Sequence, residues 1–228
     1  MKTKFLPLFL GLAALGLATA HPASAQNRDR EHVRTRTGTW QSSRGGSGIF
    51  SSTTTRGNGQ LQRQGTWTNQ NGGVGTHDYT RSYDKSTGTG TYSGTTTRPD
   101  GKATSSQGTI TKNANGSIST NGTFTNANGK VSDVSTTTVK TADGRDTTGT
   151  ITGPNGKVSN IQTDVTHSDG VTTRDETITG PNGKTYTRDA TTQVNPNGTG
   201  TTTVDVTRPD GQTNTITEQF TVTPPPKS

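Results

Sequence analysis

The chain contains no cysteine among its 228 residues. This absence excludes a disulfide framework, a thiolate metal site and a cysteine nucleophile. Long apolar runs are also missing after Ala25, and from there on the chain has a single leucine, Leu61. Only 21% of all residues are hydrophobic and 5% are aromatic. Such a composition excludes a large compact apolar core.

Helical periodicity is absent beyond the N-terminus, so we expect neither helices nor a phosphate-binding glycine loop that opens a helix. The chain after Ala25 has three histidines, His32, His77 and His167, and one adjacent acidic pair, Asp175-Glu176. Neighbouring residues of a strand face opposite sides, so this pair does not form a catalytic dyad. We therefore expect a protein that is not an enzyme, with no catalytic residue, no metal site and no cofactor.

The N-terminal segment 1–25 has the features of a signal peptide. Lys2 and Lys4 precede the apolar stretch 5–20, and Ala23-Ser24-Ala25 is typical of a cleavage site. The prediction is an exported protein, extracellular or periplasmic, that does not span a membrane after cleavage. Residues 224–228 form a short proline-rich tail.

Glycine and threonine are abundant, and a turn signal recurs along the chain. Asn-Gly and Asp-Gly pairs favour the positive φ of tight turns, so each pair of a regular series predicts a chain reversal. The pairs of this series begin at Asn58, Asn71, Asp100, Asn115, Asn128, Asp143, Asn155, Asp169, Asn182, Asn197 and Asp210. From Asp100 onward, the steps between every second pair are 28, 27, 27 and 28. This near-constant step predicts a repeating hairpin unit of about 27 residues.

A second motif, Gly-Thr followed by a large residue, occurs once in most of these repeats. Phe124 and Ile151 lie in this motif one repeat apart, and Ile178, which follows Glu176-Thr177, continues the same spacing. Threonine, a good strand former, occupies most positions between the large residues. We predict an all-β fold, a repetitive antiparallel β-meander of about 12 to 14 strands over residues 49–223. The favoured arrangement is an elongated twisted sheet. The alternatives are a curled sheet or open barrel, or a largely disordered low-complexity chain.

Positive charge is concentrated toward the N-terminus. Residues 26–113 hold 12 Lys and Arg against 5 Asp and Glu, and residues 114–228 hold 9 against 11. We expect residues 26–48, rich in Gly, Ser and Arg, to be a flexible basic lead-in. Arginines beside aromatic rings can bind and stack on anionic sugars. The candidate binding residues are Arg34, Arg36, Trp40, Arg44, Arg56, Trp67, Tyr79, Arg81, Tyr83 and Tyr92.

Three functions fit these patterns. The first is a structural or adhesin-like protein of the cell surface or extracellular matrix, which binds anionic glycans or self-associates through sheet edges. The second is a soluble periplasmic module that binds an anionic glycan or another ligand. The third is an ice-binding array of threonines, because Thr-x-Thr recurs on many expected strands. None of the three requires specific recognition of nucleic acid.

Overall fold

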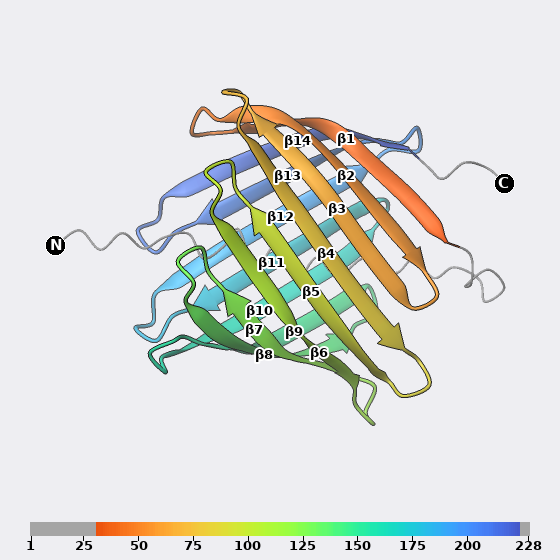
Figure 1. The fold of residues 1–228 in the computed structure, drawn as a ribbon, viewed down its shortest axis with the longest axis vertical. Coiled ribbons are helices and arrows are strands. Elements are labelled where there is room, and N and C mark those ends of the chain that lie inside the picture. The colour runs from red at the N-terminus through yellow and green to blue at the C-terminus, as the bar shows by residue number, and fades with distance from the viewer. Residues whose placement is uncertain (1–30, 224–228) are drawn as a thin grey trace.

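The computed structural model describes residues 31–223, which form fourteen antiparallel strands and no helix (Figure 1). None of the described residues belongs to a helix long and apolar enough to cross a membrane. The strands are β1 (His32–Ser42), β2 (Ser47–Gly57), β3 (Gln60–Asn69), β4 (Val74–Asp84), β5 (Thr89–Thr97), β6 (Ala103–Lys112), β7 (Ile118–Thr125), β8 (Val131–Lys140), β9 (Gly144–Thr152), β10 (Val158–Ser168), β11 (Val171–Thr179), β12 (Thr185–Val194), β13 (Thr199–Thr207) and β14 (Thr213–Thr223). The predicted all-β meander is therefore confirmed.

Every Asn-Gly and Asp-Gly pair of the predicted series lies where one strand passes to the next. At Asn58-Gly59 both residues have positive φ, 48° and 73°, which is the two-residue turn that suits the twist of a hairpin. Most other pairs end a longer turn in which only the glycine is left-handed. In one of these, the amide of Gly129 donates to the carbonyl of Asn126 at 2.9 Å. One further pair, Asn121-Gly122, falls outside the regular series and lies inside β7.

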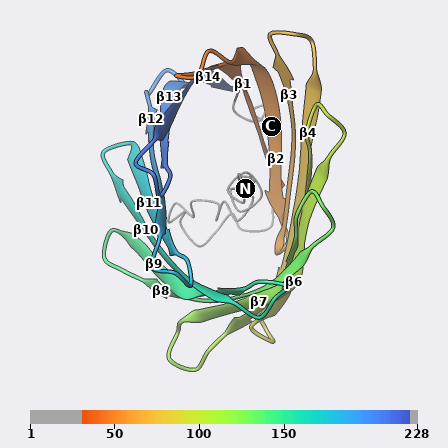
Figure 2. The same ribbon diagram turned by 90° about the vertical axis from the view of Figure 1, so that its left-hand side faces the viewer.

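The sheet closes on itself. Each strand pairs with its neighbours in sequence, and β1 also pairs with β14 from Thr35 opposite Thr223 to Ser42 opposite Ile216. Figure 2 shows the result as a flattened closed ring. The favoured elongated sheet was wrong, and so were the disordered alternative and the open form of the barrel. The even number of strands brings the first and last strands together in antiparallel order, and closure removes both edges.

The basic lead-in was also assigned incorrectly where the structure describes it. Residues 32–42 are strand β1, and only residues 43–46 form a connection before β2 begins at Ser47. The predicted signal peptide, residues 26–30 of the lead-in and the proline-rich tail lie outside the described residues. Arginines with alternating threonines suit a strand whose one face is inside the barrel, which explains why a basic segment joins the sheet.

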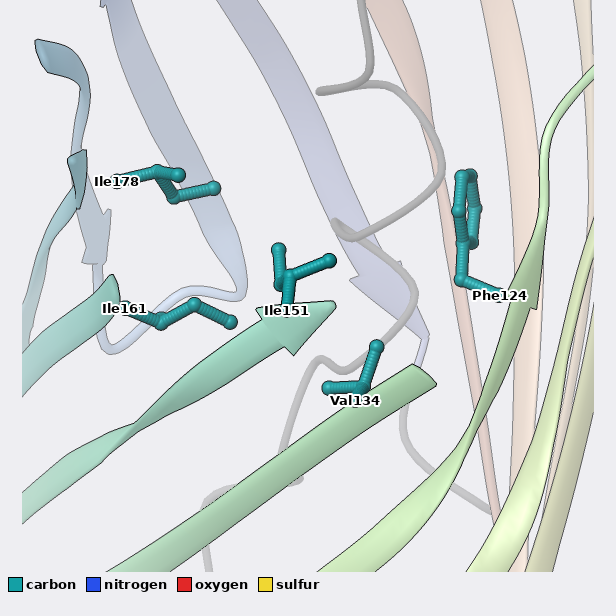
Figure 3. Close-up of a cluster of buried hydrophobic side chains, with 5 residues drawn as sticks. All are labelled: Phe124, Val134, Ile151, Ile161 and Ile178. Atoms are coloured by element: carbon teal, nitrogen blue, oxygen red, sulfur yellow. The ribbon is translucent and has the colours of Figure 1, made fainter. Parts of the chain in front are cut away.

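The buried apolar side chains all lie on one face of the closed sheet. Residues directly paired across two antiparallel strands share a face, and the strand register links every buried apolar residue to the same face. The clearest group is Phe124, Val134, Ile151, Ile161 and Ile178, on β7 to β11 (Figure 3). The regularly spaced Phe124, Ile151 and Ile178 are thus brought together in one cluster. We call this the inner face and the opposite one the outer face.

The two ends of the barrel differ in what they carry. We call one end the terminal end. It holds the start of β1, the end of β14 and the turns that follow the even-numbered strands β2 to β12. The other end, the far end, holds the seven turns that follow the odd-numbered strands. Because one repeat is two strands, turns one repeat apart lie at the same end.

Candidate functional site

Charges are sorted between the two faces of the barrel wall. Ten Lys and Arg occur within the described strands, and the register places all ten on the inner face: Arg34, Arg36, Arg56, Arg63, Arg81, Lys112, Lys140, Arg145, Arg174 and Arg188. The strand aspartates are all on the outer face: Asp78, Asp84, Asp133, Asp146, Asp164, Asp175, Asp189 and Asp205. Within the described strands, only Glu176 and Glu218 bring negative charge to the inner face.

The described strands therefore carry ten cations and two anions inward, a balance of 10 − 2 = +8, against eight aspartates outward. All nine aromatic side chains of residues 31–223 also face inward: Trp40, Phe50, Trp67, Tyr79, Tyr83, Tyr92, Phe124, Tyr186 and Phe220. An inner face of this kind attracts anions and offers them flat apolar surfaces.

The cations are concentrated toward one end as well. Nine of the ten stand in the half of their strand that is nearer the terminal end, and the exception is Arg188 on β12. A barrel of eight strands is just filled by its own side chains, and fourteen strands enclose more room. In keeping with this, Arg36 and Glu218 face inward yet have side chains 30% and 31% exposed. The inner face is therefore accessible to a ligand.

The inner face of β1 to β5 holds nearly all the residues predicted for binding. We call it the arginine–aromatic wall: Arg34, Arg36, Trp40, Phe50, Arg56, Arg63, Trp67, Tyr79, Arg81, Tyr83 and Tyr92. Of the ten predicted residues, only Arg44 lies elsewhere, in the turn between β1 and β2. Two of the predicted binding aromatics, Tyr79 and Tyr92, are buried, at 7% and 5% exposed. Alternation turns them inward once the sheet closes.

Arg36 lies at the seam where β1 meets β14. Its guanidinium donates to Glu218 Oε2 at 2.8 Å and to Thr202 Oγ1 at 2.9 Å. The same group stacks on Phe220 at 3.6 Å from the ring centre and lies 5.3 Å from that of Phe50. Burial lowers the pKa of Arg36, and the Glu218 charge opposes that effect. Arg36 is thus largely neutralised by its own partners.

The inner face of strands β1 to β5 carries no acidic residue to balance the other arginines of the wall. Burial lowers the pKa of Arg56, and the charges of Arg63, Arg34 and Arg81 lower it further. Arg63 donates from Nε to Thr54 Oγ1 at 3.3 Å, and burial lowers its pKa as well. These cations repel one another. An anion is favoured among them, because its negative charge would relieve the repulsion.

Two further titratable groups border these arginines. His77 lies opposite Gly65 on β3, and its Nδ1 is 2.9 Å from Thr96 Oγ1. Burial lowers the pKa of His77, as does the charge of Arg63. Burial also raises the pKa of Tyr79. Both shifts favour the neutral forms of these side chains, so the arginines are the main source of positive charge on the wall.

A second group of cations lies across the flattened ring, where Figure 2 places β10 to β12 on the long side opposite β2 to β4. Arg174 forms an ion pair with Glu176, and Arg188 is attracted by Glu176 and Glu218. Sequence analysis missed Arg174 and Arg188 because it favoured the basic N-terminal half, and within that half it left out Arg63 and Phe50. The alternation of faces along a strand would have found them. Arg63 lies an even number of residues from Trp67, and Arg188 from Tyr186, so each arginine shares a face with that ring.

The outer face has a different chemistry. Its hydroxyl groups pair with one another across strands, as between Ser82 and Thr91 at 2.9 Å and between Thr80 and Ser93 at 2.9 Å. An open hollow of about 680 Å³ lies over β4 to β7, lined chiefly by threonine, serine and glutamine. A smaller one of about 400 Å³ lies over β7 to β9. Neither hollow gathers a set of titratable side chains from the outer face.

Within residues 31–223, no group of three or more histidine, aspartate or glutamate side chains is placed to hold a metal ion. In comparisons with known proteins, no family model, no curated protein and no solved structure matches this chain.

Proposed function

We propose that this protein is an exported, non-catalytic binding barrel whose interior takes an acidic glycan. The observation that carries this proposal is the sorting of charge: ten cations inward and eight aspartates outward within the described strands. If the inner cations served only structural ion pairs, each would be matched by an acid on the inner face. Structural ion pairing alone therefore does not explain the sorting. The inner cations of these strands exceed the inner acids by 10 − 2 = 8.

The chemistry of the arginine–aromatic wall suits carboxylate or sulfate groups on a sugar chain. Guanidinium groups bind such anions through two parallel hydrogen bonds, and flat rings beside them supply stacking area. The acidic outer face repels the same ligand, so binding is directed to the interior.

The closed barrel does not favour the adhesive function by self-association through sheet edges. Both edges of every described strand are paired in the closed barrel, so no strand edge is open to a neighbour. The ice-binding hypothesis stays a prediction. The outer threonines hydrogen-bond to neighbouring threonine and serine side chains, and no observation favours ice binding over interior binding.

Calorimetric titration with oligogalacturonate and with a neutral oligosaccharide of equal length tests the proposal. We expect binding of the acidic chain only, weakened at least about tenfold by Arg63→Gln or Arg81→Gln, because each removes a charged hydrogen-bond donor. Arg44→Gln is the matched control, since Arg44 was predicted for binding but lies in a turn. An equal loss in Arg44→Gln, or equal affinity for the neutral chain, would refute interior binding of an acidic glycan.

A further inference from the structure

The repeat places basic turns in an arc at the far end of the barrel. Turn glycines one repeat apart, Gly101, Gly129, Gly156, Gly183 and Gly211, all lie there. The turns of the far end contain seven Lys or Arg and two Asp, a balance of +5. The seven are Arg44, Arg98, Lys102, Lys130, Lys157, Lys184 and Arg208. The six turns of the terminal end contain Lys85, Asp143 and Asp169, a balance of −1.

The spacing of these cations follows from sheet geometry. Five consecutive turns of the far end, from that between β5 and β6 to that between β13 and β14, each carry a cation. Alternate strands lie about 10 Å apart, twice the spacing of neighbouring strands. The charges therefore form an arc along a single rim, and a flat anionic surface can meet several of them at once.

Exposed aliphatic side chains gather at the same end. The structure has five exposed large hydrophobic residues in its described part, and four stand just below the far rim: Ile49 at 61%, Val74 at 53%, Val131 at 45% and Val158 at 46% exposed. Each is the first or third residue of a strand that leaves the far end. The fifth, Val139 at 51%, lies near the terminal end.

We infer that the far end docks on the surface of a bilayer that contains anionic phospholipid. Lysines next to exposed valines, as in Lys130-Val131 and Lys157-Val158, match the layered chemistry of that surface: the cation meets the headgroup, and the aliphatic side chain meets the acyl boundary. An acidic polysaccharide would use the cations but has no use for branched aliphatic side chains. This inference stands apart from the proposed interior site.

The outer wall determines the orientation of docking. Asp146, Asp164, Asp175, Asp189 and Asp205 are directly opposite one another on five neighbouring strands, β9 to β13. An anionic surface repels this row, so the barrel cannot lie on that side. The barrel stands on its far rim, and the cation-rich terminal end of its interior faces away from the membrane.

Vesicle flotation of the purified protein tests the inference, with phosphatidylcholine vesicles and with an equal mixture of phosphatidylcholine and phosphatidylglycerol. We expect partitioning onto the anionic vesicles only, and weaker binding as salt rises. The combined variant Lys130→Gln, Lys157→Gln, Lys184→Gln should lower the partition coefficient by about two orders of magnitude, since each lysine near the surface contributes about one kcal/mol. The combined variant Val131→Ser, Val158→Ser should lower it as well.

Two controls from the terminal end match these changes. Lys85→Gln and Val139→Ser remove an exposed cation and an exposed valine away from the far rim, and we expect wild-type partitioning from both. Circular dichroism confirms the fold of each variant. Failure of the wild-type protein to bind anionic vesicles, equal binding to neutral ones, or an equal loss in the two control variants would overturn the inference.

Discussion

At the scale of single residues, the inner face is shaped by aromatic rings that lie over glycines. Trp67 is directly opposite Gly75, and Tyr92 is directly opposite Gly108. A Cβ atom added at Gly108 would lie 2.8 Å from the Tyr92 ring, and one added at Gly75 would overlap the Trp67 indole. The missing side chain lets each ring lie against the wall of the barrel, which leaves the interior open.

Gly75→Ala is therefore expected to destabilise the protein by about 1–3 kcal/mol, the usual cost of overpacking. The added methyl group would displace the Trp67 indole. Chemical denaturation of the variant measures the loss. Gly65→Ala serves as the control, since its added Cβ would lie no closer than 3.3 Å to the nearest atom. Trp67→Leu combined with Gly75→Ala should cost less than the sum of the two single changes; simple additivity would contradict the contact.

At the scale of the strand, the aspartate row on β9 to β13 sets like charges directly against one another. Asp189 has Asp175 on one side and Asp205 on the other. Burial raises the pKa of Asp189, and these two charges raise it further. The strands pair despite this repulsion, so their stability comes from the backbone ladder and from the inner side chains that they bury.

Asp189→Asn is accordingly expected to stabilise the protein at neutral pH by about 0.2–1 kcal/mol, because it removes a like charge from between two others. The pKa of Asp189 in the folded state lies above its ordinary value of 3.8. Protonation of Asp189 therefore contributes favourably to the free energy of unfolding. This contribution is fully present below pH 3.8 and is lost as the pH rises through the folded-state pKa. Thermal unfolding at several pH values measures the difference, which high salt should reduce.

Asp133→Asn is the matched control for this change. Asp133 also faces outward, but its partners are Thr123 and Thr152, which carry no charge. We expect almost no stabilisation there. Equal gains at the two positions would show that the overall charge of the outer face, and not the row, determines the effect.

At the scale of the whole molecule, one seam decides the architecture. Ladder pairing between β1 and β14 closes the barrel. On the inner face, Arg36 of β1 links the two strands through its contacts with Glu218 and Phe220 of β14. Without that seam, β1 and β14 would be the open edges of a meander. Those edges would then be available for association with other chains.

Arg36→Met should lower the free energy of unfolding by about 1–3 kcal/mol, because Glu218 loses its charged partner while the aliphatic contact with Phe220 is kept. Hydrogen exchange should accelerate first in β1 and β14. Arg34→Met, on the same strand and face but without a contact to Glu218 in the structure, is expected to leave the seam unchanged. Uniform acceleration around the whole barrel would argue against a special role for the seam.

Local features of this protein were predictable from its sequence, and global ones were not. The Asn-Gly and Asp-Gly pairs of the regular series located the turns, since the positive φ of a turn glycine is a local requirement. Trp67 and Thr66 lie on opposite faces for an equally local reason, the period of two in a strand. Nine of the ten predicted binding residues share one wall because each has the strand parity that faces inward.

Only the tertiary structure decided whether the meander is open or closed, and thereby which face is inside. Closure depends on β1 meeting β14, a contact between residues about as far apart in the chain as the described part allows, and no local pattern encodes it. The same contact turned a basic segment into a strand and the aromatics inward. Turns one repeat apart would share one end of an open meander too, because a repeat is two strands, and closure bends that row of turns into a rim.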